Sequence, residues 1–170
     1  MDVLLYATEN PRNLGSIIRT SVAFNIPKIH LYDANQLLEN EECQELINLV
    51  CRRDRRNRVE IATVTELEGL LSRYVNKYAT VVGNVRRLGD PKDKLYFEED
   101  SLLIFGCESR GLPREISRRN GVEKFVIPIV HPVQCLGLSE AYAIVLFEYL
   151  RQHPKTLPGV SPGFAAETET

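Results

Sequence analysis

Residues 3–32 read VLLYATENPRNLGSIIRTSVAFNIPKIHLY, and this stretch decides the fold class. An apolar run of strand length at 3–7 is followed by Asn10 and Pro11. That pair is typical of a helix N-terminus, because asparagine caps the helix and proline fits its first turn. Apolar residues then recur with helical spacing, and KIHLY at 28–32 predicts a second strand. The order strand, helix, strand predicts a parallel βαβ unit.

The same alternation continues along the chain. Further strands are predicted at 60–64, 79–83, 101–105 and 124–130, and helices at 36–51, 65–71, from Pro113 and over 139–150, with Thr65 and Ser139 as helix caps. This predicts the α/β class, with a Rossmann-like parallel sheet covered by helices on both faces. We expect one domain over residues 1–153 and a flexible tail over 154–170, where proline and glycine recur without an apolar period.

Composition limits the possible partners. The 170 residues carry 21 basic and 23 acidic side chains, a net charge of -2, so any nucleic-acid-binding face must be local. The segment CRRDRRNR at 51–58 is such a candidate, and a solvated helix end is the alternative of equal weight. Its phosphate-contact candidates are Arg52, Arg53, Arg55 and Arg56.

Targeting signals and metal motifs are not evident. No apolar run approaches the length of a membrane span, and the N-terminus does not read as a signal peptide. The cysteines at 43, 51, 107 and 135 form no C-x-x-C pair and the histidines are scattered, so we expect reduced thiols, no metal, no membrane and a cytoplasmic location.

Three segments follow strand ends, where α/β sheets bind ligands: 10–19, 106–111 and 131–139. In the first, Arg12, Gly15 and Arg19 share a helix face, which favours either a phosphate seat beside the helix N-terminus or solvated arginines around an incidental glycine. In the second, Glu108 lies between two glycines and is either a catalytic or ligand-binding carboxylate or a helix-cap acceptor. The third is either a binding loop or a plain connection.

In this order, the three segments resemble the motifs of the TrmH/SpoU family of SPOUT-class RNA methyltransferases. The matching stretches are NPRNLGSIIRT (10–20), LIFGCESRGLP (103–113) and VIPIV (126–130) followed by CLGLSEA (135–141) and Glu148. The resemblance extends from about residue 2 to residue 152. It implies a ribose 2'-O-methyltransferase that uses S-adenosylmethionine (AdoMet), and a C-terminal trefoil knot that periodicity alone does not indicate.

The resemblance also implies roles for individual residues. Asn13 and Arg19 would hold the target phosphate and ribose, and Glu108 would order the site. Because an arginine keeps its proton below a pH of about 12, we expect Arg19 to orient the hydroxyl and stabilise its developing charge while an RNA phosphate takes the proton. Arg12 would contact RNA. The AdoMet-binding positions, reached mainly through the backbone, would be Val82, Gly83, Gly106, Ile127 and Leu136.

The third motif departs from the family pattern. Relatives usually show S-L-N where this chain has Cys135, Leu136 and Gly137, so an amide that helps to position the family's site is missing. Two hypotheses follow: an active tRNA or rRNA 2'-O-methyltransferase, or a catalytically weak RNA-binding or assembly protein on the same fold. The resemblance further implies a homodimer through the last helix. It favours tRNA over rRNA, because the first strand begins at residue 2 without an added RNA-binding domain.

Overall fold

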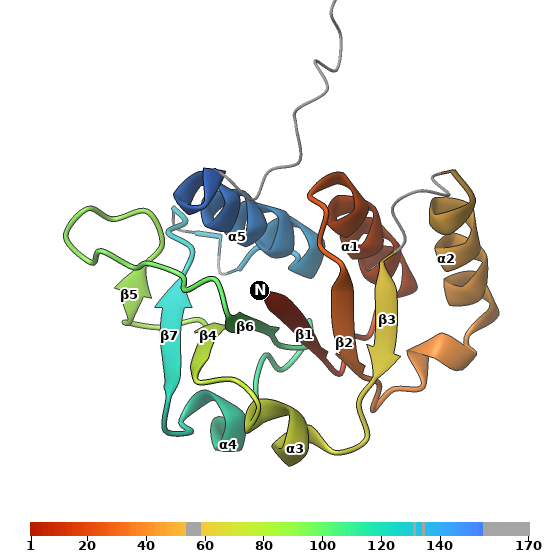
Figure 1. Cartoon of the computed structure of the whole chain (residues 1–170), viewed down its shortest axis with the longest axis horizontal. Helices are drawn as coiled ribbons and strands as arrows, with labels where there is room; N and C mark the ends of the chain where they lie inside the picture. The colour runs from red at the N-terminus through yellow and green to blue at the C-terminus, as the bar shows by residue number, and fades with distance from the viewer. Residues whose placement is uncertain (54–58, 131, 134, 155–170) are drawn as a thin grey trace, which may run out of the picture.

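The computed structural model describes residues 1–53, 59–130, 132–133 and 135–154, and in these ranges it contains one parallel sheet of seven strands (Figure 1). The strand order is β3-β2-β1-β6-β4-β7-β5, and each neighbouring pair is parallel. The strands are β1 (Asp2–Tyr6), β2 (Lys28–Tyr32), β3 (Glu60–Thr63), β4 (Asn76–Thr80), β5 (Arg86–Arg87), β6 (Ser101–Phe105) and β7 (Val122–Val126). The predicted α/β class is therefore confirmed.

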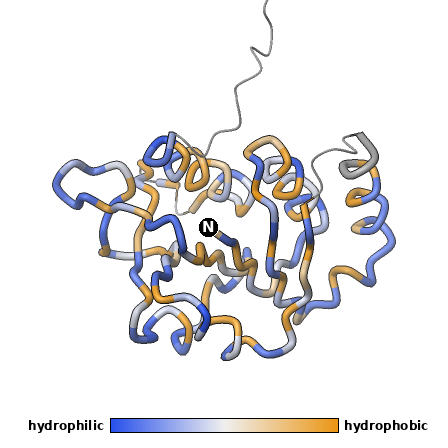
Figure 2. Tube along the Cα trace, in the orientation of Figure 1, coloured by the Kyte–Doolittle hydropathy of each residue, from blue (hydrophilic) through white to orange (hydrophobic). Residues whose placement is uncertain are grey.

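Helices cover both faces of this sheet. Figure 1 shows α1 (Pro11–Ala23), α2 (Glu41–Arg53) and α5 (Leu138–Gln152) on one face, and α3 (Leu67–Leu71) and α4 (Arg114–Ser117) on the other. A single 3-10 turn, η1 (Leu37–Glu39), precedes α2. Each face has its own apolar cluster: Leu14 and Leu146 belong to the one under α1 and α5, and Leu70 and Ile116 to the one under α3 and α4. Figure 2 shows hydrophobic residues along the central strands and more hydrophilic residues towards the outer loops.

The carboxyl ends of two strands lie earlier than the sequence predicts. The predicted strands at 79–83 and 124–130 correspond to β4, which ends at Thr80, and β7, which ends at Val126. The prediction was wrong there because apolar residues continue past the strand ends into exposed loops. The Val82 side chain is 78% exposed and that of Val130 is 83% exposed. These apolar residues therefore line the edge of the sheet where ligands bind.

Two predicted helix caps were also wrong. Thr65 does not cap α3, because Glu66 is the N-cap residue and makes no side-chain capping bond. Ser139 lies within the first turn of α5, whose N-cap residue is Gly137. At α1 the prediction is confirmed, since the Asn10 side chain accepts a hydrogen bond from the Arg12 backbone N–H at 2.9 Å. The Ser139 hydroxyl is therefore available for contacts outside its own helix.

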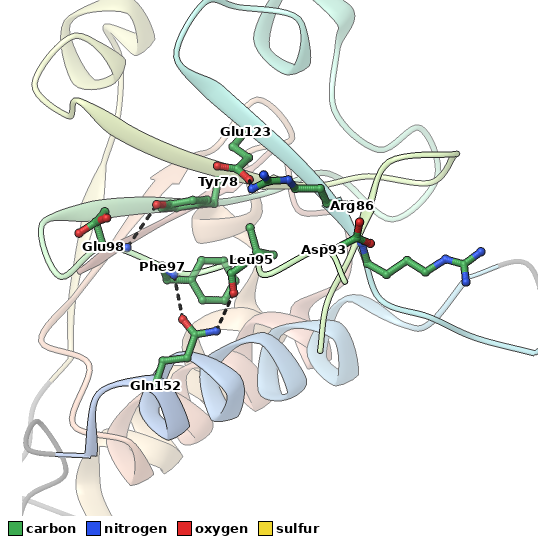
Figure 3. Close-up of polar contacts among 9 residues, drawn as sticks. Tyr78, Arg86, Asp93, Leu95, Phe97, Glu98, Glu123 and Gln152 are labelled. Atoms are coloured by element: carbon green, nitrogen blue, oxygen red, sulfur yellow. Dashed lines mark hydrogen bonds and ion pairs between the residues drawn. The ribbon is translucent and has the colours of Figure 1, made fainter. Parts of the chain in front are cut away.

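The segment between β5 and β6 is held against the sheet and α5 by polar contacts (Figure 3). The Gln152 side chain accepts from the Phe97 N–H at 2.8 Å and donates to the Leu95 carbonyl at 3.0 Å, while the Tyr78 hydroxyl accepts from the Glu98 N–H at 3.3 Å. Phe97 itself is fully buried. These contacts fix the end of α5.

Within the described ranges, no helix has the length and apolar character needed to cross a membrane.

Candidate functional site

The site is built at the carboxyl ends of β1 and β6, which are neighbours in the sheet. The first loop (residues 7–10) leads from β1 into α1, and the second loop (residues 106–112) follows β6. The second loop closes on itself, because the Gly111 N–H donates to the Cys107 carbonyl at 2.9 Å and the Cys107 N–H donates back at 3.2 Å. A Cβ at Gly106 would overlap the backbone of Gly111 and Leu112, so this tight turn requires glycine there.

Glu108 joins these two loops. Its carboxylate accepts hydrogen bonds from the backbone N–H groups of Glu9, at 2.9 Å, and Asn10, at 3.3 Å. It also accepts from the Asn13 side-chain amide at 2.8 Å. Since a carboxylate can only accept, the Asn13 NH₂ group must face Glu108 and its amide oxygen must face away. Glu108 thus fixes both the N-terminus of α1 and the orientation of Asn13.

Glu9 makes the reciprocal contact, although no motif in the sequence singles it out. Its carboxylate accepts from the Ser109 N–H at 3.1 Å and from the Ser109 hydroxyl at 2.6 Å. Each loop therefore supplies a carboxylate to the backbone of the other. We call this pair of contacts, made by Glu9 and Glu108, the carboxylate clasp. Its only signal in the sequence is an acidic residue after the strand end in each loop.

The third segment reaches this cluster through Ser139. The Ser139 hydroxyl lies 3.3 Å from the Asn13 amide oxygen and 3.1 Å from Oε2 of Glu140. The three segments selected from the sequence are thus connected in the structure through Glu108, Asn13 and Ser139.

Helix α5 is held in this position by a buried contact with α1. The Ser21 hydroxyl donates to the Ile17 carbonyl at 2.8 Å, so the Tyr142 hydroxyl, 2.5 Å away, donates to Ser21. Tyr142 is fully buried, and burial raises the pKa of its hydroxyl well above the usual range. A neutral Tyr142 therefore fastens α5 to α1 one turn beyond Ser139.

Comparison with known proteins identifies this arrangement. The family model described as the SpoU rRNA Methylase family matches residues 1–147. The chain belongs to this family. The methyltransferase expected from the three motifs is thereby confirmed at the level of the family, together with its fold class.

Relatives of this SpoU methylase share most of its length. A Mycoplasma pneumoniae protein that carries the name tRNA (cytidine(34)-2'-O)-methyltransferase is 26% identical over 160 residues, which cover 90% of this chain and 91% of the relative. A solved structure concerned with the 2-OH methylation of C/U34 on tRNA is 26% identical with a TM-score of 0.74, covering 91% of this chain and 96% of the other. An AdoMet-bound rRNA methyltransferase of Sinorhizobium meliloti is 25% identical with a TM-score of 0.63, covering 88% and 55%.

The bare patch that Gly15 was expected to leave between Arg12 and Arg19 is absent from this SpoU methylase. Gly15 is buried, and a Cβ there would touch Leu46 of α2 at 3.4 Å. The glycine therefore allows close packing of α1 on α2 instead of leaving a bare patch. Arg12 forms an exposed ion pair with Glu42 of α2, with Nε 3.2 Å from Oε1.

Arg19 is not part of the Glu108, Asn13 and Ser139 cluster within one chain. It lies six residues after Asn13 on α1, about 9 Å further along the helix axis and about 120° around it. Its side chain is exposed and has no polar partner among the described residues. Arg19 shares the outward face of α1 with Arg12, so the structure does not bring it to the residues with which the motif groups it.

The expected AdoMet positions follow three neighbouring strands. Val82 and Gly83 come after β4, Gly106 after β6 and Ile127 after β7, and these strands lie in the order β6-β4-β7. Gly83 has a φ of 144° and a Cβ there would meet nothing within 4 Å, so the space beside it is open. Of these four residues, Val82 and Ile127 are apolar and the two glycines have no side chain, which fits a ligand recognised mainly through the main chain.

For the remaining predicted site residues, the structure shows only where they lie along the chain, or does not describe them. Arg52 and Arg53 belong to the last turn of α2, and Arg55 and Arg56 lie outside the described residues. Leu136 is half-buried and directly precedes the α5 N-cap. Among the residues that the structure describes, no group of three or more His, Cys, Asp or Glu side chains is placed to hold a metal.

Proposed function

We propose that this SpoU methylase transfers a methyl group from AdoMet to the ribose 2'-hydroxyl of nucleotide 34 in a tRNA. The observation that carries the proposal is that Glu108, Asn13 and Ser139 bring the three motif segments within hydrogen-bonding distance of one another, in a chain that matches the family over residues 1–147. The tRNA is favoured over rRNA by relatives of matching length that are named for tRNA nucleotide 34.

Val82, Gly83, Gly106, Ile127 and Leu136 would hold AdoMet. The cofactor supplies a methyl group bonded to a positively charged sulfur, so the transfer requires no acid for the leaving group. The chain then has two tasks: to align the ribose hydroxyl with the methyl group and to stabilise the charge that develops on its oxygen. The open space beside Gly83 and the exposed Val82 support this assignment.

Asn13 and Arg19 would act on the ribose and its phosphate. The Asn13 amide is already oriented by Glu108, so its carbonyl is presented away from the clasp. Arg19 would orient the hydroxyl and stabilise the developing oxyanion, because a guanidinium does not lose its proton near neutral pH. An RNA phosphate takes the proton in this scheme. Glu108 orders the loops and does not itself meet the ribose.

A homodimer that packs through α5 would place the Arg19 side chain of one copy next to the surface of the other. Ile144 and Phe147 are 40% and 61% exposed on α5, and they lie on the outer surface of the helix layer, where Arg19 also projects from α1. A second copy packed on these apolar side chains would place its own outward-facing Arg19 next to this surface. The trefoil knot in the C-terminal part and a cytoplasmic location belong to the same proposal.

RNA affinity would come from the arginines that the sequence singles out. Arg12, Arg52, Arg53, Arg55 and Arg56 are the proposed contacts with phosphates. Guanidinium groups suit this task because they bind phosphate oxygens bidentately.

Methyl transfer to a defined tRNA tests the proposal. The protein is incubated with radiolabelled AdoMet and an unmodified tRNA transcript that has cytidine or uridine at position 34, and with a matched transcript that has 2'-deoxycytidine there. We expect label in the first transcript only, at a position that resists alkaline hydrolysis. RNA binding without label in any tRNA or rRNA would instead favour the catalytically weak RNA-binding protein, which the missing amide at Gly137 suggests.

A further inference from the structure

Glu140 occupies the space that a side chain at position 137 would need. Gly137 is the N-cap residue of α5 and makes no side-chain capping bond. A Cβ built on it would overlap Oε2 of Glu140 and would lie 3.3 Å from the Glu140 carboxyl carbon. The Glu140 side chain is thus folded back over the start of its own helix, next to Ser139.

Ser139 has two acceptors and one proton. Its hydroxyl lies 3.1 Å from Oε2 of Glu140 and 3.3 Å from the Asn13 amide oxygen. The carboxylate is both the nearer acceptor and the stronger one, because hydrogen bonds to ionised groups are shorter and stronger than those between neutral groups. The Ser139 proton is therefore directed to Glu140, and the Asn13 amide oxygen receives none from Ser139.

Glu108 fixes the other half of the Asn13 amide. The NH₂ group of Asn13 is bound to the Glu108 carboxylate at 2.8 Å, so the amide cannot turn over without losing that contact. The Asn13 oxygen is therefore held in one direction, with both of its lone pairs unused by these two neighbours.

We propose that Glu140 is a positioning residue, which draws the Ser139 hydroxyl away from Asn13 and so leaves both lone pairs of the Asn13 amide oxygen free. The Asn13 oxygen then orients the hydroxyl to be methylated by accepting its hydrogen bond, before the proton passes to the RNA phosphate. The inference rests on the proposed function. Gly137 is required for this position of Glu140, because any side chain at position 137 would displace the Glu140 carboxylate.

Three variants and their combination test this role. Glu140→Ala removes the preferred acceptor, and Gly137→Ala displaces it. In both variants, the Ser139 hydroxyl is expected to donate to the Asn13 amide oxygen instead. We therefore expect kcat for methyl transfer to fall roughly three- to tenfold, which corresponds to about one net hydrogen bond. The KM for tRNA should change little, since only the reacting hydroxyl is affected. Glu140→Ala combined with Ser139→Ala should recover kcat to the value of the Ser139→Ala single variant, which is measured alongside.

The recovery separates positioning from a structural role. If Glu140 only stabilised the N-terminus of α5, removal of the Ser139 hydroxyl would not restore kcat. The matched control is Glu66→Ala, an exposed glutamate beside α3 on the opposite face of the sheet, which should leave kcat unchanged. Wild-type kcat in Glu140→Ala, no recovery in the double variant, or a Ser139→Ala enzyme as slow as Glu140→Ala would each overturn the inference.

A measurement that does not require methyltransferase activity tests the hydrogen-bond assignment separately from the proposed function. The side-chain amide resonances of Asn13 should shift in Glu140→Ala and Gly137→Ala but not in Glu66→Ala, because only the first two send a hydrogen bond to the Asn13 oxygen. A wild-type protein that methylates no RNA would refute the proposed function, and these resonances would still decide the hydrogen-bond assignment. Unshifted resonances in both site variants would refute the assignment even in an active enzyme.

Discussion

The carboxylate clasp gives a quantitative prediction about how the site is held together. Glu108→Ala removes one acceptor from three donors, at 2.8, 2.9 and 3.3 Å. With each half-exposed bond contributing about 1 kcal/mol, we expect the free energy of unfolding to fall by about 2–3 kcal/mol. For a chain of this length, that lowers Tm by roughly 5–10 °C. Glu9→Ala removes one acceptor from two donors and should cost about 1–2 kcal/mol.

The two halves of the clasp should also be coupled. Both carboxylates tie the first loop to the second, so the loss of one lets the loops separate and weakens the other. The double variant should therefore lose less stability than the sum of the single variants, by about 0.5–1.5 kcal/mol.

Urea unfolding of the wild type, both single variants and the double variant measures this coupling directly. The control is Glu45→Ala, an exposed glutamate on α2 with no polar partner among the described residues, which should lie within about 0.5 kcal/mol of wild type. Effects that add to within about 0.3 kcal/mol would refute the clasp as a single unit.

Three further predictions concern the scaffold and Arg19. The hydrogen bond with His30, and after it the one from Tyr74, lowers the pKa of Asp2 in the folded protein below 3.8. The ionised Asp2 therefore stabilises the fold above pH 3.8, and this contribution is lost as the pH falls through the pKa of the folded state. Asp2→Asn should therefore lose about 1 kcal/mol at pH 7 and progressively less below about pH 4, as measured by urea unfolding at several pH values. Tyr142→Phe should cost about 1 kcal/mol in the same assay, because Ser21 keeps its bond to the backbone; a loss of more than about 3 kcal/mol would contradict this assignment. Arg19→Lys should lower kcat for methyl transfer at least tenfold if a planar fork is needed, whereas full turnover would refute that requirement.

The order of the elements was enough to predict where the site lies. Alternating strands and helices imply a parallel sheet, and the carboxyl ends of its strands meet at one edge, so Glu108 in its loop and Asn13 at the start of α1 had to lie at that same edge. What the order cannot supply is which atoms meet. Glu9 carries no motif, and its contact with Ser109 depends on the adjacency of β1 and β6, whose residues are about a hundred positions apart.

Gly15 shows why a local pattern can be misread. A glycine within an amphipathic helix is equally consistent with a ligand seat and with a neighbouring helix packed closely against it. The distinction depends on where Leu46 of α2 lies, which is a property of the whole fold. The strand ends at Thr80 and Val126 were misjudged for a related reason. Apolar residues that line a binding edge have the same hydropathy as residues buried in a core.

The net charge of -2 restricts how this methylase can hold RNA. Long-range attraction is weak, so affinity must come from contacts made after encounter. Arg12 is occupied by Glu42 in the free protein, yet the two side chains are 81% and 53% exposed. Such an exposed ion pair contributes at most about 1 kcal/mol, so a phosphate oxygen can replace the Glu42 carboxylate at little cost. The ion pair is therefore compatible with RNA binding by Arg12, and it lowers the exposed positive charge beside the site until an RNA phosphate arrives.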